Sequence, residues 1–219
     1  MKIVRVEQGT DEWDRIRVGK ITASMMDSVF AASGTKSYDV ALNNLVCDLQ
    51  GVDRFFTEDE PWFEMGKLHE PDAIFAYELR HGVDTWRDAF LIHNDYEWLG
   101  CSPDFLIGDP PTEGGEVKCR RYVASYMDAI HAPDNKYQRL GRAYFLQIQT
   151  AMLITGFDRW KLVNYYIGGE NAAPREADRD ILRDDAMIER ILERAKEFYA
   201  TAKAFADKTR PGKAAEVNT

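Results

Sequence analysis

Cysteine is scarce in this sequence, and the three cysteines present lie far apart. Cys47, Cys101 and Cys119 form neither a CxxC pair nor the even set of a disulfide framework. Three thiols also cannot supply the four ligands of an iron–sulfur cluster. The cysteine content therefore predicts a protein of the reducing cytoplasm, without disulfides and without a CxxC metal site.

Long apolar runs are missing as well. No run approaches the roughly 20 residues that span a bilayer, and the opening MKIVRVEQGTDEW lacks the apolar core of a signal peptide. A glycine-rich phosphate loop and a nucleophile elbow are also absent. We therefore expect a cytoplasmic protein with no membrane partner, no dependence on ATP and no covalent intermediate.

Basic residues are outnumbered by acidic ones, 28 to 37, which gives a formal charge of −9. This balance excludes a protein that coats nucleic acid by bulk attraction. The charge is uneven, because residues 116–142 hold six basic residues and three acidic ones. An enzyme that holds nucleic acid through a few focused contacts therefore stays compatible with the composition.

The hydrophobic pattern predicts one α/β domain over residues 1–209, followed by a flexible tail at 210–219. Helical spacing and capping residues predict helices at 11–18, after 24, at 37–49 with Ser37 as N-cap and Gly51 as stop, at 61–80, at about 136–155 and at 186–205. Short apolar segments between turn residues predict a meander of strands at 89–93, 98–101, 105–107 and 115–119, and a last strand at 160–167.

The chemistry is concentrated in Asp104 and the segment Glu116-Val117-Lys118. Residues two apart in a strand share a face, so Glu116 and Lys118 project together while Val117 turns to the other side. A hairpin can bring Asp104 beside Glu116. Two carboxylates and the Val117 carbonyl make an all-oxygen site suited to Mg²⁺ or Mn²⁺, and the ammonium can orient or deprotonate an attacking water.

A simpler interpretation of this pattern exists. Asp104 can be a turn residue, and Glu116 and Lys118 can form a surface ion pair, which is common and weak. The spacing of three residues does not by itself separate a nuclease site from such a pair.

A resemblance over a longer part of the chain favours the nuclease site over the surface ion pair. The chain resembles the phage lambda exonuclease-like family, the YqaJ-type viral recombinases of the PD-(D/E)XK nuclease superfamily, through VEQGTDEWDRIRVGKITAS, MGKLHEPDAIFAYE, CSPDFLIG followed by GEVKC, and AYFLQIQTAM. These blocks stand in the same order and span about residues 6–152. The resemblance implies a restriction-endonuclease-like core, in which a central mixed β-sheet is flanked by helices.

The resemblance also implies roles for the residues of these blocks. The metal ligands are Asp104, Glu116 and the Val117 carbonyl, and Lys118 is the catalytic lysine. Two Mg²⁺ ions are implied, for which Mn²⁺ can substitute. The helix-borne acid Glu70 faces the metals, although an ordinary solvated helix acid is the alternative.

Residues of the AYFLQIQTAM block divide between the site and the interior. Gln147 matches a glutamine of the family's site, and Tyr144 lies three residues earlier on the same helical face. Gln149 lies elsewhere on the helix, where we expect a packing hydrogen bond.

Further residues match a pocket for the terminal 5′-phosphate. The resemblance assigns Arg17 and Ser24 to this pocket, with Ser102 as a third contact, and a guanidinium and hydroxyls suit phosphate oxygens. The family's additional arginine corresponds to Ala124 here, so Arg120 or Arg121 is the candidate replacement.

Phe63 lies where the family has an apolar wedge that parts the DNA strands. A stacked aromatic side chain would do the same work. A core role for Phe63 is the alternative.

The resemblance implies a Mg²⁺-dependent 5′→3′ exonuclease that acts processively on double-stranded DNA ends with a 5′-phosphate. It would release mononucleotides, leave a 3′ overhang for a single-strand annealing protein, form a ring-shaped homotrimer, and work in a bacterial cytoplasm as a phage or prophage product. Two rivals stay open: a structure-specific or restriction-type endonuclease of the same superfamily, and a catalytically silent DNA-binding module.

Overall fold

Two mixed β-sheets and the helices packed against them position the site. The computed structural model describes residues 1–52, 61–131, 141–168 and 175–209, with the backbone alone for 61–65. The predicted tail at 210–219 lies outside the described residues, and the single domain over 1–209 stays a prediction.

The first sheet has four strands in the order β1 (Lys2–Arg5), β4 (Ala89–Ile92), β5 (Leu99–Cys101) and β2 (Ile21–Thr22). The second has five, in the order β3 (Thr85–Trp86), β6 (Phe105–Ile107), β7 (Glu113–Arg120), β8 (Arg159–Tyr166) and β9 (Arg175–Leu182). Each sheet contains one parallel pair, β2 with β5 and β7 with β8. The predicted mixed sheet is therefore confirmed, in two parts.

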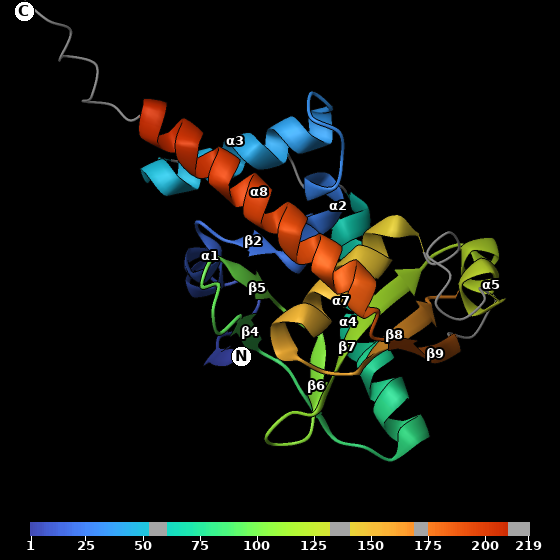
Figure 1. Ribbon diagram of the computed structural model, residues 1–219. Coiled ribbons are helices and arrows are strands. Elements are labelled where there is room, and N and C mark those ends of the chain that lie inside the picture. Colours follow the sequence, from blue (N-terminus) through green and yellow to red (C-terminus); the bar gives the residue numbers. More distant parts are fainter. Residues whose placement is uncertain (53–60, 132–140, 169–174, 210–219) are drawn as a thin grey trace, which may run out of the picture.

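Helices surround these sheets (Figure 1). They are α1 (Asp11–Arg17), the 3-10 turn η1 (Ala23–Met25), α2 (Met26–Val29), α3 (Lys36–Gln50), α4 (Pro61–His81), α5 (Val123–His131), α7 (Arg142–Thr155) and α8 (Asp185–Thr209). None of the described helices is both long enough and apolar enough to cross a membrane.

The predicted helices are confirmed, with corrections to two helix starts and one gap. Helix α3 begins at Lys36 after the extended residue Thr35, so Ser37 is not its N-cap. It ends at Gly51, as predicted, because Gly51 takes the left-handed conformation with φ of 71° that favours glycine. The predicted fifth helix begins at Arg142, because Gly141 before it has a φ of 83° that is not helical, and residues 136–140 lie outside the described residues.

The strand predictions need larger corrections. The predicted meander is two separate hairpins, because β4 pairs with β5 in one sheet and β6 with β7 in the other. Strand 160–167 is not the last, since β9 pairs antiparallel with β8. Five of the eight residues of β9 are charged, and an edge strand tolerates such a sequence because one of its sides has no neighbour. The short strands β1, β2 and β3 and the helix α5 were also not predicted.

Alternate residues of the five-stranded sheet pack against different helices, as the period of a strand requires. On one face Phe105, Val117, Val163 and Tyr165 contact Ala73, Ile74 and Tyr77 of α4. On the other face Leu106, Trp160, Leu162 and Ile181 join the large core that contains residues of α3, α7 and α8. The even-numbered positions of β7 therefore face α7, which decides where Glu116 and Lys118 point.

Two adjacent glycines in β7 allow this close packing. A Cβ atom at Gly114 would lie 2.4 Å from the Trp160 ring, and one at Gly115 would lie 2.0 Å from the Phe105 ring. Both rings are buried. Glycine is therefore required at both positions, directly before the segment that carries the chemistry.

Helices α3 and α8 lie side by side (Figure 1). The rings of Tyr38 on α3 and Phe198 on α8 pack edge to face, with centroids 5.1 Å apart. One side of α3 is thus fixed against α8, and its opposite side faces away from this contact.

Candidate active site

A cavity of about 540 Å³ lies beside the second half of β7 and contains most of the predicted site residues. We call it the active-site pocket. Its lining includes Arg17, Ser24, Glu70, Ser102, Asp104, Glu116, Val117, Lys118, Tyr144 and Gln147, together with Trp13. The structure therefore brings together residues from α1, η1, α4, β7 and α7.

Glu116 and Lys118 project to the same side of β7, as the sequence predicts. Lys118 Nζ donates a hydrogen bond to Glu116 Oε1 over 2.6 Å. Gln147 Nε2, from α7, donates to the same oxygen over 2.7 Å. Glu116 is buried, so these two donors hold its carboxylate in one orientation.

Asp104 lies at the point where β6 separates from β7. The last paired residues are Phe105 and Gly115, and the Asp104 N–H still donates to the Gly115 carbonyl over 3.1 Å. Its Oδ2 accepts a hydrogen bond from the Val117 N–H over 2.6 Å. The N–H and C=O of one strand residue point to the same side, so the Val117 carbonyl also faces Asp104.

The three carboxyl groups of the pocket influence one another. Burial and the neighbouring Glu116 and Glu70 carboxylates hold the pKa of Asp104 well above its usual range, although Lys118 and the Val117 N–H oppose the shift. Burial and the Glu116 carboxylate likewise raise the pKa of Glu70. Like charges that are held close and away from water favour either protons or a cation between them.

Lys118 is charged in this arrangement. Burial alone would lower the pKa of its ammonium, but the Glu116 and Asp104 carboxylates outweigh burial and raise the pKa above its ordinary value. A charged ammonium donates hydrogen bonds and accepts none. Lys118 can therefore orient a water molecule or hold a phosphate oxygen.

The donor set fits a hard divalent cation. Asp104, Glu116 and the Val117 carbonyl supply oxygen atoms, and the mutual repulsion of the carboxylates would be relieved by positive charge. Within the described ranges, no three His, Cys, Asp or Glu side chains form a complete cluster of metal ligands. Mg²⁺ does not need one, because it is commonly bound by one or two carboxylates, waters and substrate phosphates.

Two of the predicted phosphate contacts, Arg17 and Ser102, meet at Trp13, and we call this part of the pocket the phosphate wall. The Arg17 guanidinium lies over the Trp13 ring, 3.8 Å from its centroid. The Trp13 indole N–H donates to Ser102 Oγ over 2.9 Å. Ser24 Oγ is 3.1 Å from Thr22 Oγ1. A single indole therefore positions both the guanidinium and one of the hydroxyls.

The two candidate replacement arginines do not line this pocket, in the part of the chain that the structure describes. Arg120 donates through Nε and Nη2 to Asn164 Oδ1 over 3.3 and 3.1 Å, and its guanidinium lies 5.3 Å from the centre of the Tyr144 ring. Arg121 is exposed and lies near Tyr122. Either role in phosphate binding stays a prediction.

Two further predictions concern Gln149 and Phe63. Gln149 is fully buried, and its amide donates to the Leu182 carbonyl over 2.8 Å and accepts from the Asp184 N–H over 2.9 Å. The expected packing hydrogen bond is thus present. The wedge predicted at Phe63 depends on a side chain outside the described residues.

The sequence did not predict the role of Trp13 in the pocket, nor that Asn164 is the hydrogen-bond partner of Arg120. Trp13 lies 89 residues from its hydrogen-bond partner Ser102, and Asn164 is a buried polar residue in a strand that otherwise looks apolar. A polar residue in an apolar strand was the one available signal for Asn164. For Trp13 no local signal existed.

Comparisons with known proteins find solved structures with a similar fold. An alkaline exonuclease from Laribacter hongkongensis, LHK-Exo, matches with 27% identity and a TM-score of 0.73, over 91% of this chain and 95% of that chain. The same enzyme in complex with dAMP gives a TM-score of 0.74.

More distant structures share the fold alone. A phage-related exonuclease from Haemophilus somnus 129PT matches with 15% identity and a TM-score of 0.61, over 86% of this chain and 94% of that chain. The shutoff and exonuclease protein of Kaposi's sarcoma-associated herpesvirus matches with 11% identity and a TM-score of 0.53, over 89% of this chain and 69% of that chain. No curated protein sequence matches significantly.

The family comparison covers all of the predicted site residues in the active-site pocket. Residues 12–158 match the YqaJ-like viral recombinase domain, and this segment contains every predicted site residue from Arg17 to Gln147. The match extends over more than half of the chain. The chain therefore belongs to the family of YqaJ-like viral recombinase domains.

Proposed function

We propose that this protein is a Mg²⁺-dependent 5′→3′ exonuclease that acts on double-stranded DNA ends and prefers a 5′-phosphate. The observation that carries the proposal is the pairing of two groups in one pocket. Hydrogen bonds hold Asp104 at the Val117 N–H and Glu116 at Lys118, and Trp13 holds Arg17 and Ser102 in the same pocket. The relatedness to an alkaline exonuclease at 27% identity supports the same reaction.

The residues divide the work. Asp104, Glu116 and the Val117 carbonyl would hold the metal ions, two of them in this proposal, with Mn²⁺ able to substitute. When bound, such ions polarise the scissile phosphate, lower the pKa of a water and stabilise the leaving oxygen. Gln147 keeps Glu116 in place, and Lys118 orients water or a phosphate oxygen.

Glu70 contributes the third acid of the pocket, from α4. Burial and the neighbouring Glu116 carboxylate raise the pKa of Glu70. We assign it to the outer coordination of the metals or of their waters.

The phosphate wall would hold the end of the DNA strand that is cut. Arg17, Ser24 and Ser102 offer a guanidinium and two hydroxyls to a terminal phosphate, which charge-assisted hydrogen bonds bind well. A terminal phosphate fixed at this wall would place the first phosphodiester bond near Lys118. This arrangement would release mononucleotides, and a related enzyme crystallised with dAMP is consistent with such a product.

Further steps follow from the family. Removal of one strand from a 5′ end leaves a 3′ overhang, which a single-strand annealing protein could use in recombination. We propose a homotrimeric ring as the source of processivity, because an acidic chain of charge −9 holds DNA poorly by bulk attraction. The name of the family suggests a phage or prophage protein acting in a bacterial cytoplasm.

Linear duplex DNA with and without a 5′-phosphate tests the proposal. With Mg²⁺ we expect mononucleotides, released faster from the phosphorylated end, and no cutting of closed circles. Cutting of circles, or equal rates for both ends, would favour a structure-specific or restriction-type endonuclease. No nucleotide release under any divalent metal would favour a silent DNA-binding module.

A further inference from the structure

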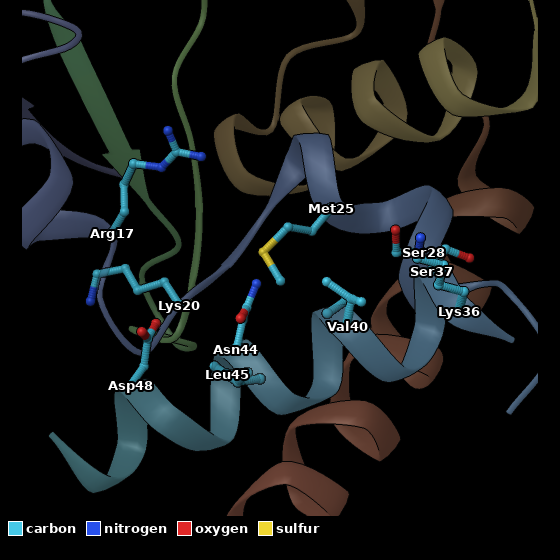
Figure 2. A pocket seen from close by; sticks show the side chains of 11 residues that line it. Arg17, Lys20, Met25, Ser28, Lys36, Ser37, Val40, Asn44, Leu45 and Asp48 are labelled. Atoms are coloured by element: carbon cyan, nitrogen blue, oxygen red, sulfur yellow. The ribbon is translucent and has the colours of Figure 1, made fainter. Parts of the chain in front are cut away.

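A second cavity of about 700 Å³ adjoins the active-site pocket, and Arg17 lines both. Figure 2 shows it between α3 and the segment that leads from α1 through β2 to α2. We call it the α3 trough. Its lining residues are Arg17, Lys20, Met25, Ser28, Lys36, Ser37, Val40, Ala41, Asn44, Leu45 and Asp48.

One wall of the trough is a regular stripe along α3. Lys36, Val40, Asn44 and Asp48 follow one another at intervals of four residues, with Ser37, Ala41 and Leu45 beside them. The stripe from Lys36 to Asp48 is about 18 Å long at 1.5 Å per residue. Even an unpaired strand stretched to about twice the 3.4 Å spacing that it has in a duplex would place more than one nucleotide along this stripe.

The trough carries positive charge at both ends. Arg17 and Lys20 lie at one end and Lys36 at the other (Figure 2). The end at Lys36 is also the N-terminus of α3, whose partial positive charge adds to that of the lysine. Among the described residues that line the trough, Asp48 is the single acid; it lies at the Lys20 end (Figure 2), and its Oδ2 accepts the Gly19 N–H over 2.7 Å, so three basic side chains face one acidic side chain.

The middle of the trough is apolar and open. Met25, Val40 and Leu45 contribute to it, and Val40 is 40% exposed. Asn44 lies between the charged ends in Figure 2, and its amide can both donate and accept hydrogen bonds. An apolar middle with an amide suits bases and sugars, and cations at both ends suit phosphates on either side.

We propose that the α3 trough binds unpaired DNA, namely the strand that the active site leaves intact. This inference rests on the proposed function, because an exonuclease that removes one strand frees the other at the same place. The shared residue Arg17 puts the trough next to the pocket for the cut strand. Cations at both ends favour a polymer with successive phosphates over a mononucleotide with one.

Binding of a short single-stranded oligonucleotide with a 5′-hydroxyl tests the proposal. The full chain is titrated in EDTA, so that no hydrolysis occurs, and fluorescence anisotropy reports the Kd. Val40→Glu places an acid in the middle of the trough, and we expect roughly tenfold weaker binding from the repulsion of phosphates. Asn43→Glu adds the same charge to an exposed position of α3 outside the trough lining, and we expect binding close to that of the unchanged protein.

The salt dependence of the same titration gives a second measurement. Removing two phosphate contacts with Lys20→Ala and Lys36→Ala together should reduce the slope of log Kd against log salt by about 1.4, at about 0.7 per contact for single strands. An unchanged slope, or equal affinities for Val40→Glu and Asn43→Glu, would overturn the proposal. If dAMP displaces the oligonucleotide from the unchanged protein, but not from Val40→Glu or from the double lysine variant, the trough is a mononucleotide site and the proposal is overturned.

A duplex assay separates this inference from the proposed function. If the unchanged protein releases mononucleotides with Mg²⁺ but the trough variants bind single strands normally, only the inference fails. If the unchanged protein releases none, the proposed function fails, whatever the trough variants bind.

Discussion

The active-site pocket and the α3 trough share Arg17 but hold their charges in different ways. In the pocket, Glu116 is buried and fixed by Lys118 and Gln147. In the trough, Lys36 is exposed and Lys20 only partly covered. Charges that are buried and hydrogen-bonded interact strongly with each other and weakly with salt, whereas exposed charges are screened.

Because of this difference, substitutions in the two regions should affect different measured quantities. A change in the pocket should alter the rate of hydrolysis or the affinity for metal, because its groups act at fixed positions. A change in the trough should alter the affinity for DNA and its dependence on salt. The following predictions test whether the effects of pocket substitutions and trough substitutions are separate.

Lys118→Ala should have the largest effect. We expect nucleotide release from linear duplex to fall on the order of 10³-fold, because removal of one preorganised hydrogen-bond donor at the reacting group typically lowers the rate by about 10²- to 10³-fold. Quantification of released mononucleotides measures it. Lys203→Ala, on an exposed position of α8, is the matched control and should leave the rate unchanged. Lys118→Ala should also leave single-strand binding in EDTA unchanged. A loss of that binding would show that the active-site pocket, and not the trough alone, binds the single strand.

Asp104→Asn should abolish stabilisation by Mg²⁺. The Asn oxygen can still accept the Val117 N–H, but the charge is gone. At a free concentration about 100 times Kd, a ligand raises the free energy of unfolding by about 2.7 kcal/mol, and this gain should disappear. Melting temperatures with Mg²⁺ and with EDTA measure the change.

The same variant makes a second, opposite prediction without metal. Since Glu116 and Glu70 repel the Asp104 carboxylate, Asp104→Asn should be more stable than the unchanged protein in EDTA. A lower melting temperature in EDTA would show that repulsion between these acids is not important in the folded state.

Gln147→Leu should reduce the affinity for Mg²⁺ and the rate by about 10- to 100-fold, as expected when a group that orients a metal ligand is removed. The rate measured at increasing Mg²⁺ checks this, and it should partly recover at high concentration. Gln149→Leu on the same helix is the contrast. It removes buried hydrogen bonds to Leu182 and Asp184, so it should lower stability by about 1–3 kcal/mol and leave the dependence on Mg²⁺ as it was.

Trp13→Phe should have the smallest effect. The phenyl ring keeps a surface beneath Arg17, but the hydrogen bond to Ser102 is lost. A loss of about 1 kcal/mol corresponds to roughly fivefold, and we expect it in the preference for a 5′-phosphate. Initial rates on phosphorylated and hydroxyl ends provide the ratio, and an unchanged ratio would remove Trp13 from the phosphate wall.

Much of the site was predictable from local spacing. The period of a strand places Glu116 and Lys118 on one face, and helical spacing separates Gln147 from Gln149. The hairpin between β6 and β7 then places Asp104 beside Val117. Each of these relations involves residues close in the chain or on one regular element, where backbone geometry alone decides which side chains meet.

Other features were not predictable from spacing. Strand β9 carries five charges, so its place beside β8 depends on the edge of a sheet that must first exist. The meander divides into two sheets because β5 pairs with β2, which lies about 80 residues earlier in the chain. Such pairings depend on competition among distant segments, which a local pattern does not describe.

The amino-acid sequence alone was enough to predict the Asp104, Glu116 and Lys118 set, the family resemblance and most of the helices. Only the tertiary structure decided that Trp13 holds Arg17 and Ser102 together, and that a stripe of α3 forms a basic trough beside the active-site pocket. The physical reason is the distance along the chain over which each effect acts. Backbone periodicity acts over a few residues, whereas packing brings side chains together from anywhere in the chain.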